Sequence, residues 1–385
     1  MAKKKVCVIT GSRADYGLLK PLSWRLKEDP EIDFSLLITG SHLLEEFGFS
    51  LKAIIEDGFD TSHQIPILSD CKSELKMSQA TGIVTQKAAQ KLHAIQPDCV
   101  VLLGDRYEIL GAATAALLLR IPIAHIHGGE ITEGAIDESI RHAITKMSHI
   151  HFVTTQEHKR RVEQLGEDPQ HVFCVGAPAL DLIASTPPLS LLDLSKSIEF
   201  DLSPKFFLIT LHPETLGETS VKTMFTEVCA ALTNFNDFKV LWTNSNADTG
   251  GAQLNELLAG LPKKFPQQHF VVGSLGSERY YSAIDNCSAV IGNSSSGLIE
   301  VPYFKKPTIN LGIRQKGRLR GPSVIDANFD CHQISQAIEK ALSQSFSNQL
   351  DGQSPYGAPG AAQKMHQLIK DMKWKLAPPK PFFDL

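Results

Sequence analysis

Short apolar runs alternate along this chain with longer segments in which apolar residues recur every three or four positions. The short runs predict strands that are buried on both faces, and the longer segments predict amphipathic helices. In the first half, strands are predicted at residues 6–10, 34–39, 99–103, 121–126, 149–154 and 171–175. In the second half, they are predicted at residues 206–210, 239–243, 269–272, 289–291 and 308–311. This alternation predicts two α/β domains with parallel sheets.

Irregular stretches separate these sets of elements. Residues 183–204 include Pro187 and Pro188 and show no regular period, so a domain boundary is expected there. We therefore expect an N-terminal domain over residues 1–185 and a C-terminal domain over residues 186–360. Residues 361–385 are expected to form a helix and tail that pack back on the domains.

Composition narrows the class of protein. A length of 385 residues favours two domains, and 42% hydrophobic with 21% charged residues is typical of a globular chain. The net charge of −4 gives no support for binding nucleic acid. The longest apolar run, residues 109–119, is too short to cross a membrane, and no signal peptide is evident. Seven cysteines without a Cys-x-x-Cys pair argue against a zinc knuckle or a disulfide framework. A cytoplasmic protein is expected.

The loop after strand 289–291 predicts a phosphate site. It reads Gly-Asn-Ser-Ser-Ser-Gly-Leu-Ile-Glu over residues 292–300, with a helix expected to open near Gly297. Free N–H groups at a helix start, together with serine hydroxyls, bind phosphate or diphosphate. Glu300, one turn later, could accept hydrogen bonds from ribose hydroxyls. The alternative is a serine-rich connection in which Glu300 is a solvated first-turn acid.

The first loop excludes two common nucleotide-binding motifs. Residues 11–17 read Gly-Ser-Arg-Ala-Asp-Tyr-Gly, which is neither a Gly-x-Gly-x-x-Gly loop nor a phosphate-binding P-loop. NAD binding and ATP hydrolysis are therefore disfavoured. Arg13 could hold a diphosphate through its planar guanidinium, or it could form a surface ion pair with Asp15.

Polar residues also follow other predicted strands, at the edge of the sheet where α/β domains bind ligands. Asp105 could act as an acid or base, or it could cap a helix. Alternation places His125 and His127 on one side of their strand, and an acid or base role for His127 is favoured over metal binding. Asp137 and Arg141 are four apart and could form a helical ion pair. His212 and Arg314 follow strands of the second half.

These motifs together resemble the UDP-N-acetylglucosamine 2-epimerases. The resemblance rests on residues 11–17, 104–108, 125–130, 136–149, 212–215, 292–302 and 314–318. It extends from Val6 to about Trp374 and is nearest to the hydrolysing branch, which supplies N-acetylmannosamine for sialic acid synthesis. It implies a GT-B fold, with two Rossmann-like domains that face each other across a cleft and UDP on the C-terminal side.

The resemblance also implies roles for individual residues. Ser294, Ser295 and Gly297 would hold the diphosphate, Glu300 the ribose, Arg13 and Arg314 the phosphate charge, and residues 273–281 the uracil. Asp105, Asp137 and His212 would serve proton transfer and contact with the sugar and diphosphate.

Two departures from the family pattern stand out. Many relatives carry Glu where this chain has His127, so the imidazole takes over the proton, or Glu130 does, or the substrate differs. Leu18 stands where the non-hydrolysing bacterial branch has Lys.

The expected reaction converts UDP-N-acetylglucosamine and water to N-acetylmannosamine and UDP. It proceeds by elimination to 2-acetamidoglucal and then hydration, without a cofactor or a metal. The expected acid/base and leaving-group residues are Asp105, His127, Glu130, Asp137 and His212. The alternatives are a UDP-N,N'-diacetylbacillosamine 2-epimerase of the legionaminic acid pathway, a non-hydrolysing epimerase and a GT-B glycosyltransferase. The expected partners are a UDP-sugar and further copies of the chain in a homodimer or larger homo-oligomer, with neither nucleic acid nor membrane.

Overall fold

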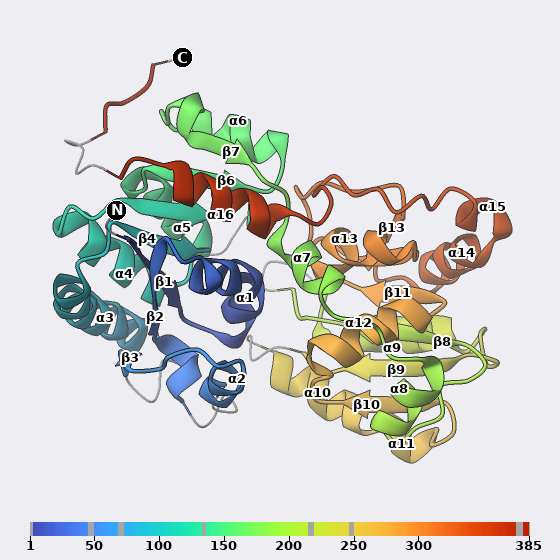
Figure 1. The fold of residues 1–385 in the computed structure, drawn as a ribbon. Helices are drawn as coiled ribbons and strands as arrows, with labels where there is room; N and C mark the ends of the chain where they lie inside the picture. The colour runs from blue at the N-terminus through green and yellow to red at the C-terminus, as the bar shows by residue number, and fades with distance from the viewer. Residues whose placement is uncertain are drawn as a thin grey trace. The chain divides into compact units, whose positions relative to one another are not determined.

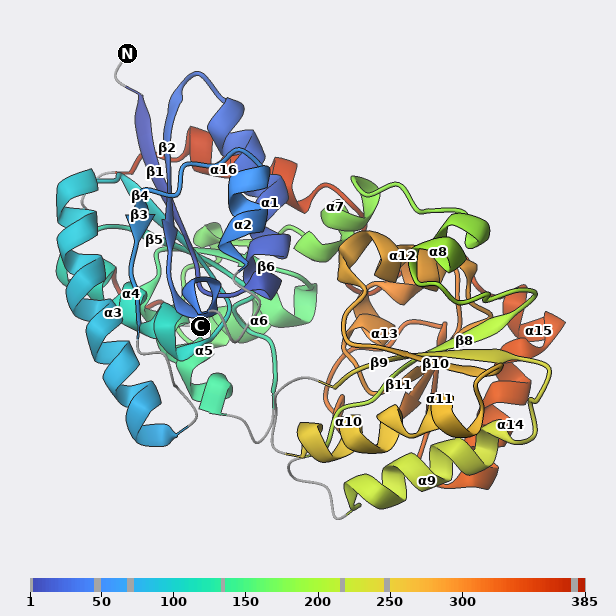
Figure 2. The same ribbon diagram turned by 90° about the horizontal axis from the view of Figure 1, so that it is seen from below.

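The computed structural model describes residues 3–44, 50–67, 73–132, 136–214, 219–245, 250–374 and 380–384. The chain forms two compact units: the first consists of Met1–Leu182 with Pro359–Leu385, and the second of Ile183–Ala358. Each unit has one parallel sheet with helices on both of its faces (Figures 1 and 2). The predicted fold class, two Rossmann-like α/β domains, is confirmed.

The sheet of the first unit has the order β3-β2-β1-β4-β5-β6-β7, and all of its pairings are parallel. Its strands are β1 (Lys4–Thr10), β2 (Ile32–Ile38), β3 (His63–Gln64), β4 (Cys99–Leu103), β5 (Ile123–Ile126), β6 (Ile150–Val153) and β7 (Val172–Cys174). The sequence did not predict β3, because two residues carry no hydrophobic period.

Successive residues of β1 fill two separate cores, one on each face of the sheet. Val6 and Val8 pack beneath α1 (Arg13–Glu28) and α16 (Ala361–Asp371). Cys7 and Ile9 pack beneath α3 (Glu74–Ile95) and α4 (Tyr107–Leu118). This alternation is the expected consequence of the two-residue period of a strand.

Helix α16 belongs to the first unit although it comes last in the chain. Ala361, Ala362, Met365 and Ile369 are part of the same core as Val6 and Val8. The carboxylate of Asp181 accepts the backbone N–H groups of Gly360, at 2.7 Å, and of Ala362, at 3.0 Å, at the start of this helix. The remaining helices of this part of the chain are η1 (Gly40–Leu43), α2 (Leu51–Glu56), α5 (Ile136–Met147), α6 (Gln156–Gln164), η3 (Pro169–His171) and α7 (Pro178–Ala184).

The sheet of the second unit has the order β10-β9-β8-β11-β12-β13 and is also parallel. Its strands are β8 (Phe206–Thr210), β9 (Lys239–Thr243), β10 (His269–Val272), β11 (Ala289–Gly292), β12 (Thr308–Leu311) and β13 (Val324–Ala327). The sequence did not predict β13. Its helices are α8 (Leu191–Ser197), α9 (Val221–Leu232), α10 (Gly251–Ala259), α11 (Leu261–Lys264), α12 (Gly276–Asn286), α13 (Ser296–Ile299), η4 (Val301–Phe304), α14 (Cys331–Leu342) and α15 (Gln344–Ser347).

Both sheets reverse their strand order once, between β1 and β4 in the first unit and between β8 and β11 in the second. Such a reversal opens a crevice beyond the carboxyl ends of the two strands, and α/β proteins bind ligands there. We use the terms first crevice and second crevice for these two places. Within the described residues, no helix combines the length and apolar character needed to span a bilayer.

Candidate active site

Asp105 lies in the first crevice, directly after the turn that ends β4. Its carboxylate accepts hydrogen bonds from Nε of Arg141, at 2.8 Å, and from a second nitrogen of the same guanidinium. The residue at the N-cap position of α4 is Arg106, and no side-chain cap is present there. The capping interpretation of Asp105 is therefore wrong.

Arg141 is buried and ties together several segments around this crevice. Besides Asp105, it donates to Glu138 Oε2 at 2.8 Å, to Thr132 Oγ1 at 2.7 Å and to the carbonyl oxygen of Glu130 at 2.8 Å. Among the described residues, its ion pairs are with Asp105 and Glu138, not with Asp137 as the helical spacing suggested.

Asp137 is the carboxyl group of α5 best suited to exchange a proton. Burial raises the pKa of Asp137, and the negative charge of Asp105 raises it further, while Arg106 and Arg141 oppose this effect. A carboxyl group whose pKa is shifted toward neutral can both take up and release a proton during a reaction.

His127 and Glu130 form a second pair of proton-transfer candidates. Nδ1 of His127 lies 3.4 Å from Oε1 of Glu130, and Nε2 of His127 is buried without a hydrogen-bond partner in the described part of the chain. Glu130 is buried, and its Oε1 also accepts from Thr154 Oγ1 at 3.4 Å. An imidazole with one nitrogen near a carboxylate and the other unused can hold a proton.

His125 has a structural role. Its Nε2 lies 2.8 Å from the carbonyl oxygen of Gly104, and its Nδ1 lies 3.3 Å from Thr145 Oγ1. Burial lowers the pKa of His125 to about 3, so the ring is neutral at neutral pH. Strand β5 ends at Ile126, and His127 has a left-handed φ of 71°. The strand alternation used to pair the two histidines therefore does not extend to His127.

No metal-binding group of three or more His, Cys, Asp or Glu side chains occurs over the residues that the structure describes. His149 and His151 repeat the His-x-His spacing of residues 125–127, but His151 pairs with Glu167, with 2.9 Å between His151 Nε2 and Glu167 Oε2.

Sequence reasoning missed a cluster in the first crevice formed by the buried Asp15 and Glu108 with the half-exposed Arg106. Nε of Arg106 donates to Oε1 of the fully buried Glu108 at 2.5 Å. Burial raises the pKa of Asp15 to about 7; Glu108 and Asp105 also raise it, whereas Arg106 lowers it. Arg13 is exposed while Asp15 is buried, and no ion pair between them occurs within the described ranges. Asp15 lies in the first turn of a helix, where acids are common, so its burial left no signal in the sequence.

The loop after β11 lies in the second crevice and supplies unused hydrogen-bond donors. The helix predicted near Gly297 begins at Ser296, but α13 is a single turn that is followed by η4. The backbone N–H groups of Ser294 and Ser295 have no protein acceptor among the described residues. They and the serine hydroxyls, rather than the dipole of a long helix, are the groups of this loop that could receive an anion.

Gly297 contributes to this loop through packing. Its N–H already donates to the carbonyl oxygen of Ser294 at 3.2 Å. A Cβ at this position would lie 2.6 Å from Cγ2 of Thr308 on β12, so only glycine allows this close contact.

Glu300 is held by two hydroxyl groups. Its carboxylate accepts hydrogen bonds from Ser296 Oγ and, at 3.3 Å, from the hydroxyl of Tyr281, and burial raises the pKa of Glu300. Ribose hydroxyls could replace these donors. Residues 276–281 of the predicted uracil loop belong to α12, which leaves residues 273–275 as loop.

His212 and Arg314 flank the serine loop. Nδ1 of the buried His212 lies 3.2 Å from Ser245 Oγ, and burial together with Arg314 lowers the pKa of His212 to about 4. His212 is therefore neutral at neutral pH. Arg314 follows β12, and its guanidinium donates to the carbonyl oxygen of Asn293 at 3.1 Å. Thr215, the last residue of the motif over residues 212–215, lies outside the described residues.

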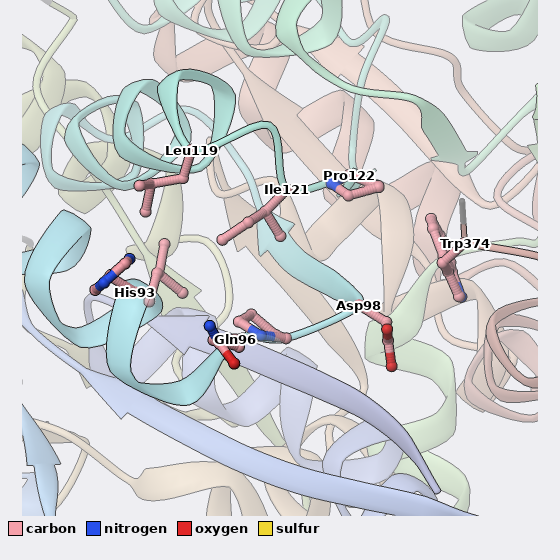
Figure 3. Close-up of a pocket in the computed structure, with 9 residues that line it drawn as sticks. His93, Gln96, Asp98, Leu119, Ile121, Pro122 and Trp374 are labelled. Atoms are coloured by element: carbon pink, nitrogen blue, oxygen red, sulfur yellow. The ribbon is translucent and has the colours of Figure 1, made fainter. Parts of the chain in front are cut away.

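A pocket elsewhere on the first unit is separate from these residues. It has a volume of about 370 Å³ and is lined by the last turn of α3, the end of α4 and Trp374 (Figure 3). Asp98 and Pro122 line it, and they directly precede β4 and β5. The pocket therefore lies at the amino ends of these strands, whereas Asp105 and His127 follow their carboxyl ends.

The family model and the relatives of known name point to the same family of proteins. The family model described as UDP-N-acetylglucosamine 2-epimerase matches residues 24–370. A Campylobacter jejuni protein named GDP/UDP-N,N'-diacetylbacillosamine 2-epimerase (hydrolyzing) is 38% identical, covering 90% of this chain and 89% of its own. The Escherichia coli polysialic acid biosynthesis protein P7 is 37% identical, covering 99% and 98%.

The fold also matches that of solved structures. The crystal structure of UDP-GlcNAc 2-epimerase from Neisseria meningitidis, bound to UDP-GlcNAc, superposes with a TM-score of 0.80 at 15% identity, covering 95% of this chain and 100% of that one. On the evidence of the family model and of these two relatives, the chain belongs to the UDP-N-acetylglucosamine 2-epimerase family.

Proposed function

We propose that this protein is a hydrolysing 2-epimerase that acts on UDP-N,N'-diacetylbacillosamine and releases UDP and the free, C2-inverted sugar. The observation that carries the proposal is the contrast between the two crevices. Carboxyl groups, among them Asp137 with a raised pKa, and an imidazole surround the first. Serine hydroxyls and backbone N–H groups that have no protein acceptor among the described residues surround the second. C2 inversion with loss of UDP needs both sets of groups.

The chemistry explains this need. The hydrogen on C2 is not acidified by an adjacent carbonyl, so a base can remove it only as the bond between C1 and the UDP oxygen breaks. The product of this step is a glycal with a C1–C2 double bond. Water then adds its hydroxyl to C1, and a proton returns to the opposite face of C2. Two acid/base groups on different faces of the sugar are therefore required.

In this proposal, Asp137 and the pair of His127 with Glu130 are the two acid/base groups. Asp105, whose carboxylate accepts hydrogen bonds from Arg141, orients the sugar. The substitution of His127 for the usual Glu preserves a proton carrier, because Glu130 lies 3.4 Å from the ring.

The second unit is assigned to the leaving group. Ser294, Ser295 and Arg314 stabilise the negative charge that develops on the diphosphate, and Glu300 accepts hydrogen bonds from the ribose. A neutral His212 can donate one hydrogen bond to a phosphate oxygen without adding charge. Arg13, exposed on the first turn of α1, is assigned to the remaining phosphate charge.

The substrate assignment follows the hydrolysing relative from Campylobacter jejuni, whose name specifies a diacetylbacillosamine nucleotide. The proposed substrate therefore differs from UDP-N-acetylglucosamine, the substrate that the sequence led us to expect. UDP-N-acetylglucosamine remains the second candidate, because the Escherichia coli relative of similar identity is named for polysialic acid biosynthesis.

Proton NMR in deuterated water tests the proposal directly. The protein is incubated separately with UDP-N,N'-diacetylbacillosamine and with UDP-N-acetylglucosamine. We expect UDP and a free C2-deuterated, C2-inverted sugar to form faster from the diacetylated substrate. Faster release of N-acetylmannosamine would move the assignment to the second candidate. A product that keeps UDP would identify a non-hydrolysing enzyme, and no turnover of either substrate would overturn the proposal.

A further inference from the structure

Asn293 lies where three segments of the second crevice meet. It directly follows β11 and precedes Ser294 and Ser295, and its side chain is fully buried. Its place in the sequence predicted no role for it. Its hydrogen bonds, however, connect the serine loop to the segments that carry His212 and Arg314.

The side chain of Asn293 fixes the main chain after β8. The backbone N–H of His212 donates to Oδ1 of Asn293 at 2.8 Å, and Nδ2 of Asn293 donates to the carbonyl oxygen of His212 at 2.8 Å. One amide therefore satisfies both backbone groups of one residue, as a neighbouring strand would. Asp lacks the donor that this arrangement needs, and Ala lacks both groups.

The backbone of Asn293 fixes the segment after β12. Its carbonyl oxygen accepts from Arg314 Nη1 at 3.1 Å and from Nε2 of the buried Gln315 at 2.8 Å. Oε1 of Glu214 accepts the N–H groups of Ile313, at 2.6 Å, and of Arg314, at 3.1 Å. The segment of Arg314 is thus held both from the serine loop and from the segment after β8.

We propose that Asn293 is a positioning residue that fixes the His212 and Arg314 segments against the serine loop, so that a nucleoside diphosphate meets a preassembled site. The inference rests on the proposed function, since it assigns the diphosphate to the second crevice. Groups that are held in place before binding avoid the entropy cost of being ordered by the ligand. Asn293 itself need not touch the nucleotide.

The test measures UDP affinity by calorimetry in Asn293→Ala and Asn293→Asp. We expect the Kd for UDP to rise by about tenfold or more in both variants, the loss expected when charge-assisted hydrogen bonds are misplaced. If Asn293 acts through Arg314, Asn293→Ala should cost less affinity in an Arg314→Ala background than in the wild type.

Asn310→Ala is the matched control. Asn310 is a buried asparagine of the same unit, and its Nδ2 donates to Asp326 Oδ1 on β13 at 2.7 Å. This variant should lose stability but keep the wild-type Kd for UDP. If Asn310→Ala lost as much affinity for UDP as Asn293→Ala, the effect of Asn293 would be one of general stability, and the inference would be overturned.

Amide hydrogen exchange without nucleotide provides a readout that does not depend on the proposed function. Exchange over residues 211–214 and 312–315 should be faster in both Asn293 variants and unchanged in Asn310→Ala. Wild-type exchange at both segments, or a Kd for UDP within threefold of wild type in a folded variant, would overturn the inference.

If Asn293→Ala does not fold, the result for Asn293→Asp tests the inference, because Asp preserves the side-chain volume and the oxygen that accepts the N–H of His212. Failure of the wild type to bind UDP would instead overturn the proposed function.

Discussion

The two crevices lie at equivalent places in two sheets of similar topology, yet their side chains differ in kind. Around the first lie six carboxyl groups and two guanidinium groups, those of Asp15, Asp105, Glu108, Glu130, Asp137, Glu138, Arg106 and Arg141. The second is lined by hydroxyl groups, backbone N–H groups, a neutral imidazole, the Arg314 guanidinium and the carboxyl groups of Glu214 and Glu300. The shared topology supplies the position, and the loops supply the chemistry.

The difference indicates that the first crevice suits proton exchange and that the second suits the binding of an anion. Burial raises the pKa of Asp15 and of Asp137, so these two carboxyl groups of the first crevice can store and deliver protons. Backbone N–H groups, hydroxyl groups and the Arg314 guanidinium suit an anion, so we expect the second crevice to hold a diphosphate.

Asp137→Asn should break proton transfer while leaving nucleotide binding intact. Because the amide cannot exchange a proton, we expect turnover to fall by about 10²–10⁴-fold, with the Kd for UDP unchanged. Turnover is measured by C2 deuterium incorporation, and the Kd by calorimetry. The control is Glu56→Gln, which changes an exposed acid of the same unit that pairs only loosely with Lys52. Turnover of Asp137→Asn near that of the control would remove Asp137 from the mechanism.

Arg314→Ala should weaken the binding of UDP, which Asp137→Asn should leave intact. Loss of one charged hydrogen-bond donor should raise the Kd for UDP by about 10–100-fold, or roughly 1.5–3 kcal/mol. Arg320→Ala serves as its control, because Arg320 pairs with Asp326 on β13. Equal losses in the two variants would mean that general charge, not the second crevice, governs UDP affinity.

Asp15 makes the stability of the first unit depend on pH. Unfolded Asp ionises near pH 3.9, whereas the pKa of folded Asp15 is about 7. Between these values the folded protein keeps a proton that the unfolded chain has lost, so its stability falls as pH rises and levels off above pH 7. Asp15→Asn removes this loss. The free energy of unfolding of Asp15→Asn, measured relative to wild type, should therefore rise by about 2 kcal/mol between pH 5 and pH 7.5.

Urea unfolding at the two pH values measures this gain. Asp33→Asn, at an exposed position of β2, should show no such change. A pH-independent difference between Asp15→Asn and wild type would show that Asp15 is ionised throughout this range.

Ser220→Ala should have the smallest effect and should be confined to the second unit. Ser220 caps α9 by accepting the N–H of Thr223 at 3.1 Å. Its loss should cost about 1 kcal/mol, seen as faster amide exchange in the core around β8 but not around β1. Equal loss of protection in both cores would show that the two units unfold together.

The hydrophobic pattern was sufficient to predict the sheets but not their edges. Eleven predicted strands correspond to strands of the structure, because parallel strands buried on both faces carry long apolar runs. β3 and β13 were missed. β3 has two residues, and β13 includes the exposed Asp326, so neither shows such a run.

The candidate site was predictable as a set of loops but not as a set of contacts. The position of Asp105 after a strand, and of Glu300 one turn after Gly297, predicted that both residues lie in loops beyond the carboxyl ends of the strands. The sequence could not show that Arg141 pairs with Asp105, since these residues are 36 positions apart. It could not reveal the burial of Asp15 and Glu108 either, because burial depends on packing between distant segments.

Helix α16 has a consequence for how the protein is made. The ribosome releases residues 1–182 first, but four apolar side chains of their core arrive only with residues 361–369. The nascent first unit therefore carries an uncovered hydrophobic strip during synthesis of the entire second unit. Of the two units, the one that starts to fold first is completed last, and its apolar strip is open to chaperones and to aggregation until residues 361–369 have left the ribosome.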